Sequence, residues 1–368
     1  MKLRFNRSEM ADALGAASSV APARTPKEIL KCVRMEALSD VVLLSATDLE
    51  LSLRTAVTQV EVDKTGDTLV MADTMSRIVH ECTDEILTAE VLQNQLHVRG
   101  AGSHFRIVTQ APAEFPPVPG MEGEPDFTID HALLRRLMEW TVFASAREST
   151  RYAINGVLWE LSGEMLTLAA TDGRRLSVGR GAATSVSTRA VPHAIVPPKA
   201  LSLFSRLPAE EGATVGVKIS RNQLVLKAGG TTVSSSLVEG HFPKYQDVIP
   251  QDCDRSVTLV TQEFLSALKR AALLTNEESK GVRLSFSEGN LTLSTRAPEQ
   301  GEATISLPIN YKGEAIDMGF NPVFLTDVLR VTHTEEITFA FKEANRPGLI
   351  RLDNDFVHVV MPVNLSSA

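Results

Sequence analysis

The chain has 368 residues, of which 43% are hydrophobic and 22% charged, and its formal net charge is -8. Such a length exceeds one ordinary hydrophobic core and predicts two or three domains. The composition excludes a disordered chain, and the acidic charge excludes a protein that wraps nucleic acid tightly through many Lys and Arg side chains.

The N-terminus and the cysteines indicate the cytoplasm and no cofactor. The first residues, MKLRFNRSEMADAL, lack the apolar stretch of a signal peptide, and no run approaches the ~18 apolar residues of a membrane span. The cysteines are far apart and have no His at metal-ligand spacing: Cys32, Cys82 and Cys253. We expect small core residues here, and neither disulfides nor a zinc site.

The first segment, residues 5–119, predicts two helices that are each followed by strands. Asn6 can cap the first helix, with Glu9 three residues later, and its apolar face carries Met10, Leu14 and Ala17. Strand-like runs follow at 33–35 and 41–46, and the second of them ends in Thr47-Asp48. A second helix begins near Asp73, before strands around 96–98 and 105–108, and its inward side chains are Met75, Ile78, Val79 and Cys82.

The second segment repeats this order. Asp130 can cap a helix with Leu133, Leu137 and Trp140 at helical spacing, and Pro197-Pro198 opens a helix with Leu201, Phe204 and Leu207 inward. Short motifs recur at a shift of 124 to 128 residues: Ala170-Thr171-Asp172 after Ala46-Thr47-Asp48, Asn222-Gln223-Leu224 after Asn94-Gln95-Leu96, and Phe242-Pro243 after Phe115-Pro116. This spacing indicates an internal repeat.

A third segment from about Arg255 again holds two helices and their strands. One helix follows Thr261 and buries Phe264, Leu265 and Leu268, and the other starts at Asn321-Pro322 and carries Phe324, Leu325 and Val328. Strands are expected at 282–286 and 291–294 across a turn at 288–290, and alternating apolar residues predict later strands at Ile337, Phe339 and Phe341, then Val357, Val359 and Met361.

These segments predict an α+β fold of three similar domains, each built from two helix-plus-strands halves. Linkers rich in Pro, Gly and acidic residues, at 119–126 and 249–256, place the domains at 1–122, 123–252 and 253–368. If the domains join with constant curvature, sheets lie outside and helices inside. A head-to-tail contact between two copies would then close a ring.

The stretch 151–178 combines two strands with a polar cluster, Thr171-Asp172-Gly173-Arg174-Arg175. Asp172 beside the arginines could suggest an enzyme, but no nucleophile and base pair or phosphate-binding loop accompanies it. We expect Asp172 to close a turn and Gly173 to adopt an unusual backbone conformation, and we expect no catalysis. The histidines are scattered, and even His358, in an apolar strand, is expected to be hydrogen-bonded rather than a metal ligand.

Several motifs resemble bacterial DNA polymerase III beta subunits, the sliding clamps of replication. They are R-Y-x-I-N-G at 151–156, A-T-D-G-x-R-L at 170–176, E-G-x-F-P-x-Y at 239–245, N-E-x-x-x-G-V-R-L at 276–284, G-F-N at 319–321 and V-V-M-P-V-N-L at 359–365. The resemblance implies the DNA clamp fold and a homodimeric ring that encircles double-stranded DNA without sequence preference. It also implies a hydrophobic groove that binds short linear motifs of the replicative polymerase, clamp-loader subunits and repair proteins.

The resemblance assigns the peptide groove to Ile154, Thr171, Gly173, Arg174, Arg175, Leu176, Pro243, Val248, Val359, Met361, Pro362 and Val363. Aliphatic and Met side chains suit an adaptable apolar floor, and the arginines could hold an acidic flank of the ligand. Plain core packing is the alternative for Val359, Met361 and Val363. The chain departs from the family at Ala153, Arg174, Asn364 and the extra residues 366–368, which affects the outer part of the groove.

The resemblance also assigns DNA contacts and a joint between subunits. The DNA contacts are Arg24, Arg147, Lys199, Arg206, Lys280 and Asn321, for which a solvated surface is the alternative. The joint pairs Phe105 and Ile107 with Leu273 and Leu274, flanked by Glu299 and Glu302, unless these are core residues. The other functions open at this point are a monomeric peptide-binding scaffold that does not encircle DNA, a small-molecule binder and, last, an enzyme.

Overall fold

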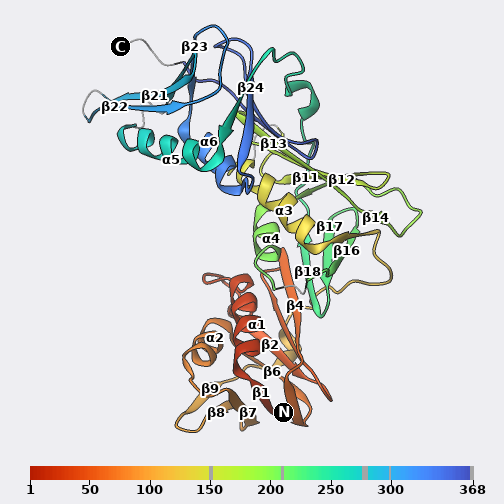
Figure 1. The fold of residues 1–368 in the computed structure, drawn as a ribbon. Helices are drawn as coiled ribbons and strands as arrows, with labels where there is room; N and C mark the ends of the chain where they lie inside the picture. Colours follow the sequence, from red (N-terminus) through yellow and green to blue (C-terminus); the bar gives the residue numbers. More distant parts are fainter. Residues whose placement is uncertain (149–151, 209–210, 276–280, 298–299, 365–368) are drawn as a thin grey trace. The chain divides into compact units, whose positions relative to one another are not determined.

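The computed structural model describes residues 1–148, 152–208, 211–275, 281–297 and 300–364. Its contacts divide the chain into two compact units (Figure 1). Unit 1 comprises Met1–Leu134 and Ala183–Leu237, and unit 2 comprises Arg135–Ala182 and Val238–Ala368. Both units combine antiparallel sheets with short helices, which confirms the predicted α+β class.

Unit 1 contains a five-stranded antiparallel sheet in which side chains alternate between core and solvent. In β1, Leu3 and Phe5 are buried while Lys2 and Arg4 are exposed, as a strand period of two requires. β9 lies at one edge of the sheet. The strand order is β5 (Val60–Lys64), β1 (Lys2–Asn6), β7 (Ile86–Leu92), β8 (Gln95–Arg99) and β9 (His104–Val108).

A nine-stranded sheet forms the rest of unit 1. It joins strands from the predicted first and second domains, because Leu53 of β4 pairs with Val233 of β18. The predicted domain boundaries therefore do not mark the compact units, and the three-domain division stays a prediction. The order is β14 (Thr184–Ser185), β10 (Phe127–Asp130), β16 (Thr214–Ile219), β17 (Gln223–Ala228), β18 (Thr231–Ser236), β4 (Leu51–Val57), β3 (Val42–Thr47), β2 (Cys32–Ala37) and β6 (Gly66–Met71).

The helices of unit 1 are α1 (Arg7–Val20), α2 (Ala72–Glu81) and α4 (Pro198–Phe204). The predicted cap of α1 is confirmed, because the Glu9 backbone N–H donates to Asn6 Oδ1 over 3.2 Å. The Glu9 carboxylate does not complete a capping box; it accepts the backbone N–H groups of Thr58 and Gln59 at 2.9 and 2.7 Å. The predicted inward residues of α1 are buried: Met10, Leu14 and Ala17.

Unit 2 contains a second pair of sheets. In the larger one Leu176 of β13 pairs with Val359 of β26, which again joins residues from two predicted domains. Its strands run in the order β11 (Val157–Ser162), β12 (Met165–Thr171), β13 (Arg175–Ala182), β26 (Phe356–Val360), β25 (Gly348–Leu352), β24 (Glu336–Phe341) and β19 (Arg255–Val260). The smaller sheet has the order β22 (Gly301–Pro308), β21 (Asn290–Ala297), β20 (Val282–Ser287) and β23 (Ile316–Phe320), with β22 at an edge.

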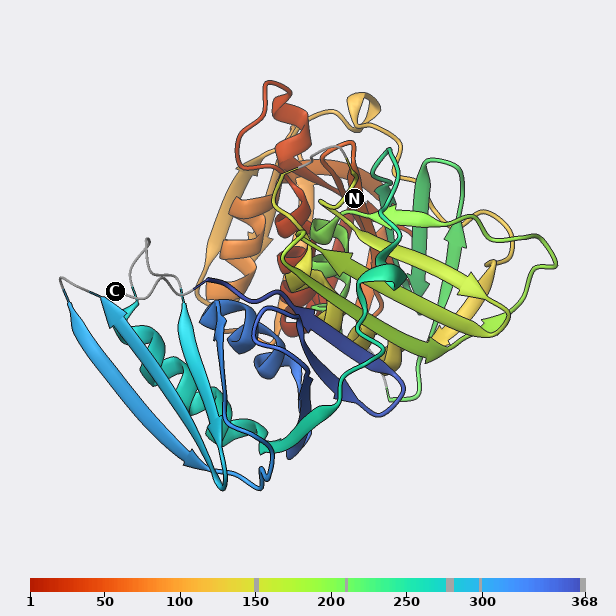
Figure 2. The ribbon, with the colours of Figure 1, turned by 90° about the horizontal axis from the view of Figure 1, so that it is seen from above.

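Helices α5 (Thr261–Ala271) and α6 (Pro322–Val331) belong to unit 2, and α3 (His131–Thr141) spans the point of division. α5 lies along the smaller sheet (Figure 2) and buries Phe264, Leu265 and Leu268 as predicted. Asp130 caps α3 through the Leu133 N–H at 2.8 Å, as predicted. The inward face of α3 differs slightly, because Leu134 and Met138 are buried while Leu133 is only partly so.

Short elements complete the fold. They are the 3-10 turns η1 (Glu28–Lys31), η2 (Pro112–Glu114), η3 (Val142–Ala144), η4 (Tyr245–Val248) and η5 (Ala272–Leu274), and the strand β15 (Ala194–Val196). The linker at 119–126 is not free in solution, because the Asp126 carboxylate is buried and accepts the Ile219 N–H at 2.7 Å and Arg189 Nη2 at 3.0 Å. This linker is thus held against the sheet of unit 1.

The predicted repeat appears in the β3–β4 turn of unit 1, residues 47–51, which we call the first hairpin. Thr47 Oγ1 donates to the Leu51 carbonyl at 3.2 Å and accepts the Leu49 N–H at 3.0 Å. Asp48 Oδ1 accepts the N–H groups of Glu50 and Leu51 at 3.0 and 2.7 Å. Leu49 has φ 84° and is 51% exposed, so a leucine occupies a left-handed conformation that favours glycine.

Replacing Leu49 by glycine should raise the free energy of unfolding of unit 1 by about 0.5–1 kcal/mol, because the steric cost of the left-handed backbone disappears. Chemical denaturation followed by circular dichroism measures this change. Leu49→Ala is the matched control, since it removes the same exposed side chain but keeps a Cβ at positive φ. An equal gain from both substitutions would show that the backbone strain is not the cause.

Candidate functional site

The predicted polar cluster forms the turn between β12 and β13, residues 171–175, which we call the second hairpin. Thr171 Oγ1 donates to the Arg175 carbonyl at 2.6 Å and accepts the Gly173 N–H at 3.1 Å. Asp172 Oδ1 accepts the N–H groups of Arg174 and Arg175 at 2.9 and 3.1 Å, and Gly173 has φ 85°. The predicted roles of Asp172 and Gly173 are confirmed, and each bond has a counterpart in the first hairpin.

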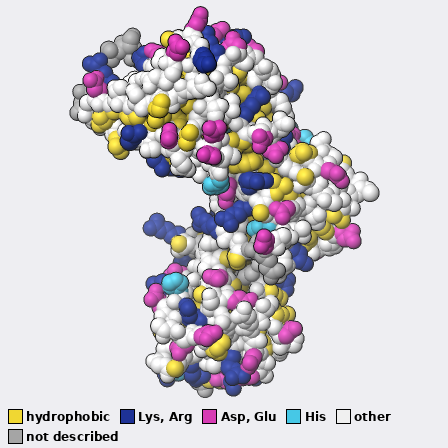
Figure 3. All heavy atoms as spheres, viewed as in Figure 1, with side chains coloured by type: hydrophobic (Ala, Val, Ile, Leu, Met, Phe, Trp, Pro, Cys, Tyr) yellow, Lys and Arg dark blue, Asp and Glu magenta, His cyan; other side chains and the backbone are white. Residues whose placement is uncertain are grey.

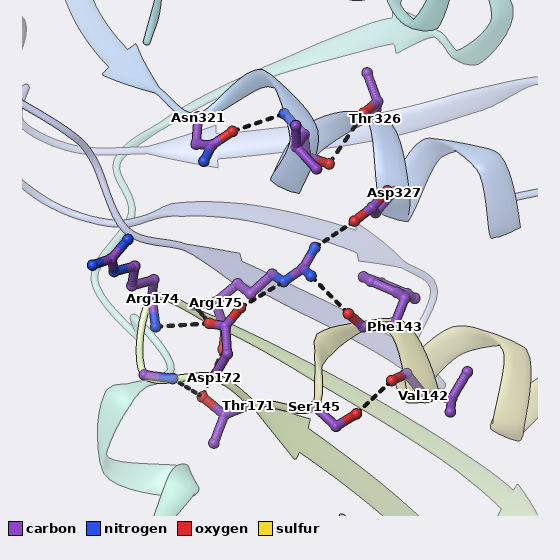
Figure 4. Close-up of polar contacts among 12 residues, drawn as sticks. Val142, Phe143, Ser145, Thr171, Asp172, Arg174, Arg175, Asn321, Thr326 and Asp327 are labelled. Carbon is purple, nitrogen blue, oxygen red and sulfur yellow. Dashed lines mark hydrogen bonds and ion pairs between the residues drawn. The ribbon is translucent and has the colours of Figure 1, made fainter. Parts of the chain in front are cut away.

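The Arg175 guanidinium connects the second hairpin to two other elements (Figure 4). Its Nε donates to Asp172 Oδ2 at 3.0 Å, one terminal nitrogen to Asp327 Oδ2 of α6 at 2.8 Å, and the other to the Phe143 carbonyl of η3 at 2.7 Å. It also lies over the rings of Phe143 and Phe324, 5.4 and 4.6 Å from their centroids. Its side chain is only 9% exposed, so Arg175 is a structural cation here.

Arg174 differs sharply from its neighbour. It is exposed, points away from Arg175 (Figure 4), and its side chain makes no hydrogen bond or ion pair to another described residue. The expectation that both arginines face an acidic ligand therefore needs revision. Arg174 is placed for such a contact, whereas the Arg175 guanidinium is already occupied by two carboxylates and a carbonyl.

The chain that follows β26 runs beside the second hairpin. The Met361 N–H donates to the Arg174 carbonyl at 2.9 Å, and the Val363 N–H donates to the Gly319 carbonyl at 2.8 Å. Met361 lies outside the strand and is 42% exposed, whereas Val359 is buried at 2%. Core packing therefore describes Val359, and Met361 presents an apolar side chain to solvent.

The remaining predicted groove residues also lie in unit 2. The Ala153 N–H donates to the His241 carbonyl at 3.1 Å, which holds the 153–154 segment against the chain that leads to Pro243. Gly240 at φ 124° permits this approach, because a Cβ there would lie 3.1 Å from the Ala153 Cβ. Ile154 and Leu176 are buried, Pro243, Pro362 and Val363 are partly buried, and Val248 at the end of η4 is 53% exposed.

Three contributors to this site were not predicted as such: Phe143, Phe324 and Asp327. Phe324 was expected to point into the core, but it is partly buried beneath the Arg175 guanidinium. Asp327 lies 152 residues from Arg175 in the sequence. No local spacing rule connects side chains so far apart, and the sequence marks Asp327 only as the one acidic residue of α6, which also carries Arg330.

His358 of β26 lies in the same region and contradicts the expectation of a hydrogen-bonded histidine. It is fully buried, its ring centroid lies 5.6 Å from that of Phe143, and neither ring nitrogen has a hydrogen-bond partner among the described residues. Burial lowers the pKa of His358 to about 3, with a smaller contribution from the Arg175 charge. The imidazole is therefore neutral at neutral pH.

The predicted DNA contacts are exposed where the structure describes them, except Asn321, which is partly buried. In unit 1, Arg24, Lys199 and Arg206 are exposed, and Figure 3 shows Lys and Arg side chains gathered near the C-terminal end of α1. Lys199 is already paired with the Asp48 carboxylate of the first hairpin. In unit 2, Arg147 is exposed, and Asn321 caps α6 through its Oδ1 and the Val323 N–H at 2.9 Å. Lys280 lies outside the described residues.

The predicted joint residues lie on or near sheet edges. Phe105 and Ile107 belong to the edge strand β9, and Ile107 is 7% exposed while Phe105 is partly exposed. In unit 2, Leu273 of η5 is 77% exposed, and Leu274 is partly buried. Glu302 is exposed on the edge strand β22, and Glu299 lies outside the described residues. Apart from Ile107, the described side chains of this set are accessible enough to contact another chain.

No helix in the described part of the chain is long and apolar enough to cross a membrane. The described residues also contain no group of three or more His, Cys, Asp or Glu side chains that could hold a metal ion.

Comparison with known proteins gives matches along nearly the whole chain. The N-terminal, central and C-terminal domains of the DNA polymerase III beta subunit match residues 1–119, 128–244 and 246–364. A beta sliding clamp of Pseudomonas aeruginosa is 32% identical over 368 residues, covering 99% of this chain and 100% of the relative. One of Chlamydia muridarum is 29% identical over 366 residues and covers 99% of each chain.

Solved structures are similar over the same extent. A sliding clamp from Pseudomonas aeruginosa bound to griselimycin has a TM-score of 0.91 at 32% identity and covers 99% of this chain and 100% of that one. The clamp of Bacillus subtilis has a TM-score of 0.90 at 26% identity, with 99% of each chain covered. The fold is thus the DNA clamp fold. The chain belongs to the DNA polymerase III beta subunit family, the bacterial DNA sliding clamps.

Proposed function

We propose that two copies of this protein form a ring around duplex DNA and tether the replicative polymerase, the clamp loader and repair proteins through a peptide groove in unit 2. The observation that carries the proposal is the backbone hydrogen bond between exposed Met361 and exposed Arg174 of the second hairpin. A tether keeps its partner at high effective concentration, so a weak contact sustains long synthesis.

The groove suits a short linear motif with Leu or Phe anchors and an acidic flank. Met361 and Val248 offer exposed apolar side chains, and Arg174 offers a cation without a partner among the described residues. Each buried anchor contributes roughly 1.5–3 kcal/mol, which after ordering costs corresponds to micromolar affinity. A similar clamp has been solved with bound griselimycin, so a clamp of this fold accepts a ligand.

No catalytic step belongs to this proposal. The acid and base cluster that the sequence offered is a structural one, because the Asp172 carboxylate is used by two backbone N–H groups and by Arg175. The proposed DNA contacts reach the phosphate backbone, so binding is non-specific, weakens with salt and allows sliding. The proposed compartment is the cytoplasm.

The double variant Met361→Asp with Arg174→Ala should weaken capture of a peptide with Leu and Phe anchors and an acidic flank by at least about tenfold. A carboxylate replaces an apolar contact and the free cation is lost, each costing on the order of 1 kcal/mol or more. Fluorescence anisotropy of the labelled peptide measures the affinity. Met165→Asp is the matched control, because Met165 is also 42% exposed and lies in unit 2. Unchanged capture by the double variant would refute this placement.

The ring itself is tested by loading onto nicked circular DNA. The wild-type protein should have the mass of two chains at micromolar concentration, stay on the circle after loading, and leave when the circle is cut into a linear molecule. The mass of a single chain, with peptide capture intact, would instead support a monomeric peptide-binding scaffold that does not encircle DNA.

A further inference from the structure

Asp327 lies on α6, outside the residues assigned to the groove, yet it bonds the guanidinium that holds the second hairpin. We propose that Asp327 is a positioning residue: acting through Arg175, it fixes the second hairpin in the geometry that receives a peptide. This inference rests on the proposed groove and adds α6 to the elements that determine its affinity.

The first hairpin shows that such a turn forms without an arginine at the position of Arg175. It has the same bonds from its Thr and Asp side chains, although Leu51 occupies the position of Arg175. The Arg175 contacts are therefore not required to form such a turn. Among the described residues, one ion pair links the first hairpin to a helix, that of Asp48 with Lys199; Lys199 is 56% exposed, and exposed pairs contribute little.

The second hairpin is fixed far more firmly. Asp327 and Asp172 both bond a guanidinium whose side chain is 9% exposed, and charge-assisted bonds of this kind are strong and directional. Asp172 in turn accepts the Arg174 N–H, and the Arg174 carbonyl accepts the Met361 N–H. A continuous series of bonds thus runs from α6 to the two exposed side chains that the ligand is proposed to touch.

Removing Asp327 leaves the guanidinium with one carboxylate in a mostly buried place. A buried charge that loses a partner is costly, so movement of the Arg175 side chain toward solvent becomes more favourable. Because Arg175 begins β13 and bonds Asp172, its movement would loosen the turn and shift Arg174 relative to Met361. Sites whose supporting contacts are loosened lose affinity without losing any direct contact.

The test compares Asp327→Ala and Asp327→Asn with Asp317→Ala, which removes the more exposed Asp317 pair with Arg283 in the same unit. We expect Asp327→Ala to weaken peptide binding about tenfold, Asp327→Asn to weaken it less because the amide keeps a hydrogen-bond acceptor, and Asp317→Ala to leave it unchanged. The affinity is measured by anisotropy with the same labelled peptide.

Amide hydrogen exchange supplies a readout that direct contact or general destabilisation would not give. In Asp327→Ala, exchange at the Gly173, Arg174 and Arg175 N–H groups should rise, while the corresponding groups of the first hairpin should not change. Wild-type affinity in both Asp327 variants, with Met361→Asp still impaired, would overturn the positioning role and leave the groove standing. Weaker binding without faster exchange at 173–175, or faster exchange in both hairpins, would also overturn it. Normal binding by Met361→Asp would instead remove the groove.

Discussion

Lowering the pH from 7 to about 4 should destabilise unit 2, and the variant His358→Leu should lose much of that response. His358 is fully buried and neither ring nitrogen is hydrogen-bonded to a described residue, so protonation would place an unpaired charge in an apolar strand. Burial lowers the pKa of His358 from 6.5 to about 3. Between these two values, His358 therefore binds a proton in the unfolded chain, where it is solvated, but not in the folded chain.

The direction and the pH window follow from these two values. Above 6.5 neither state is protonated at His358 and the full stability is present. As the pH falls from 6.5 toward 3, the unfolded state gains the proton, and stability falls by about 1.4 kcal/mol per pH unit, or roughly 3 kcal/mol by pH 4. Below a pH of about 3, His358 is protonated in both states and no longer contributes to the change of stability with pH.

Urea denaturation at several pH values gives the free energy of unfolding for each variant. The free energy of unfolding of the wild type should fall relative to that of His358→Leu, and this loss should grow steadily as the pH falls below 6.5. His333→Leu, which removes an exposed histidine of the same unit, should follow the wild-type slope. If His358→Leu retained that slope as well, the buried imidazole would not be the titrating group.

The local features of the fold follow from the sequence because their chemistry spans only a few residues. Asn6, Asp130 and Asn321 each accept a backbone N–H two or three positions ahead, and this spacing is visible in the sequence. The same holds for the repeat of Thr-Asp turns. Its two copies, the first and second hairpins, form the same set of bonds.

Features that depend on distant partners were not predictable in this way. The sequence suggested that Arg175, like Arg174, is a ligand-binding cation. Its guanidinium instead donates hydrogen bonds to Asp327 and to the Phe143 carbonyl, and its side chain is mostly buried. Nothing within a few residues distinguishes the two arginines. The pairing of β4 with β18 and of β13 with β26 likewise joins segments that the sequence assigns to different domains, since strand partners are set by long-range packing.

Replacing Leu273 by Asp should convert the proposed dimer to single chains, raising the dimer dissociation constant by at least about 100-fold. Leu273 is 77% exposed, the highest value among the exposed large hydrophobic side chains described. Burial in a joint would contribute roughly 1.5–3 kcal/mol, and a carboxylate there adds a desolvation cost of several kcal/mol. Edge strands β9 and β22, each of which pairs with a strand on one side only in the described part of the chain, flank the proposed contact.

Sedimentation velocity over a range of protein concentrations measures this effect. The two site variants then act as controls for each other: Leu273→Asp should bind the labelled peptide normally as a single chain, and Met361→Asp should remain a dimer. Loading onto circular DNA should fail for Leu273→Asp, since a single chain cannot close a ring. A Leu273→Asp protein with the wild-type dissociation constant would place the joint elsewhere. The proposed peptide groove would be unaffected, because its residues all belong to one unit.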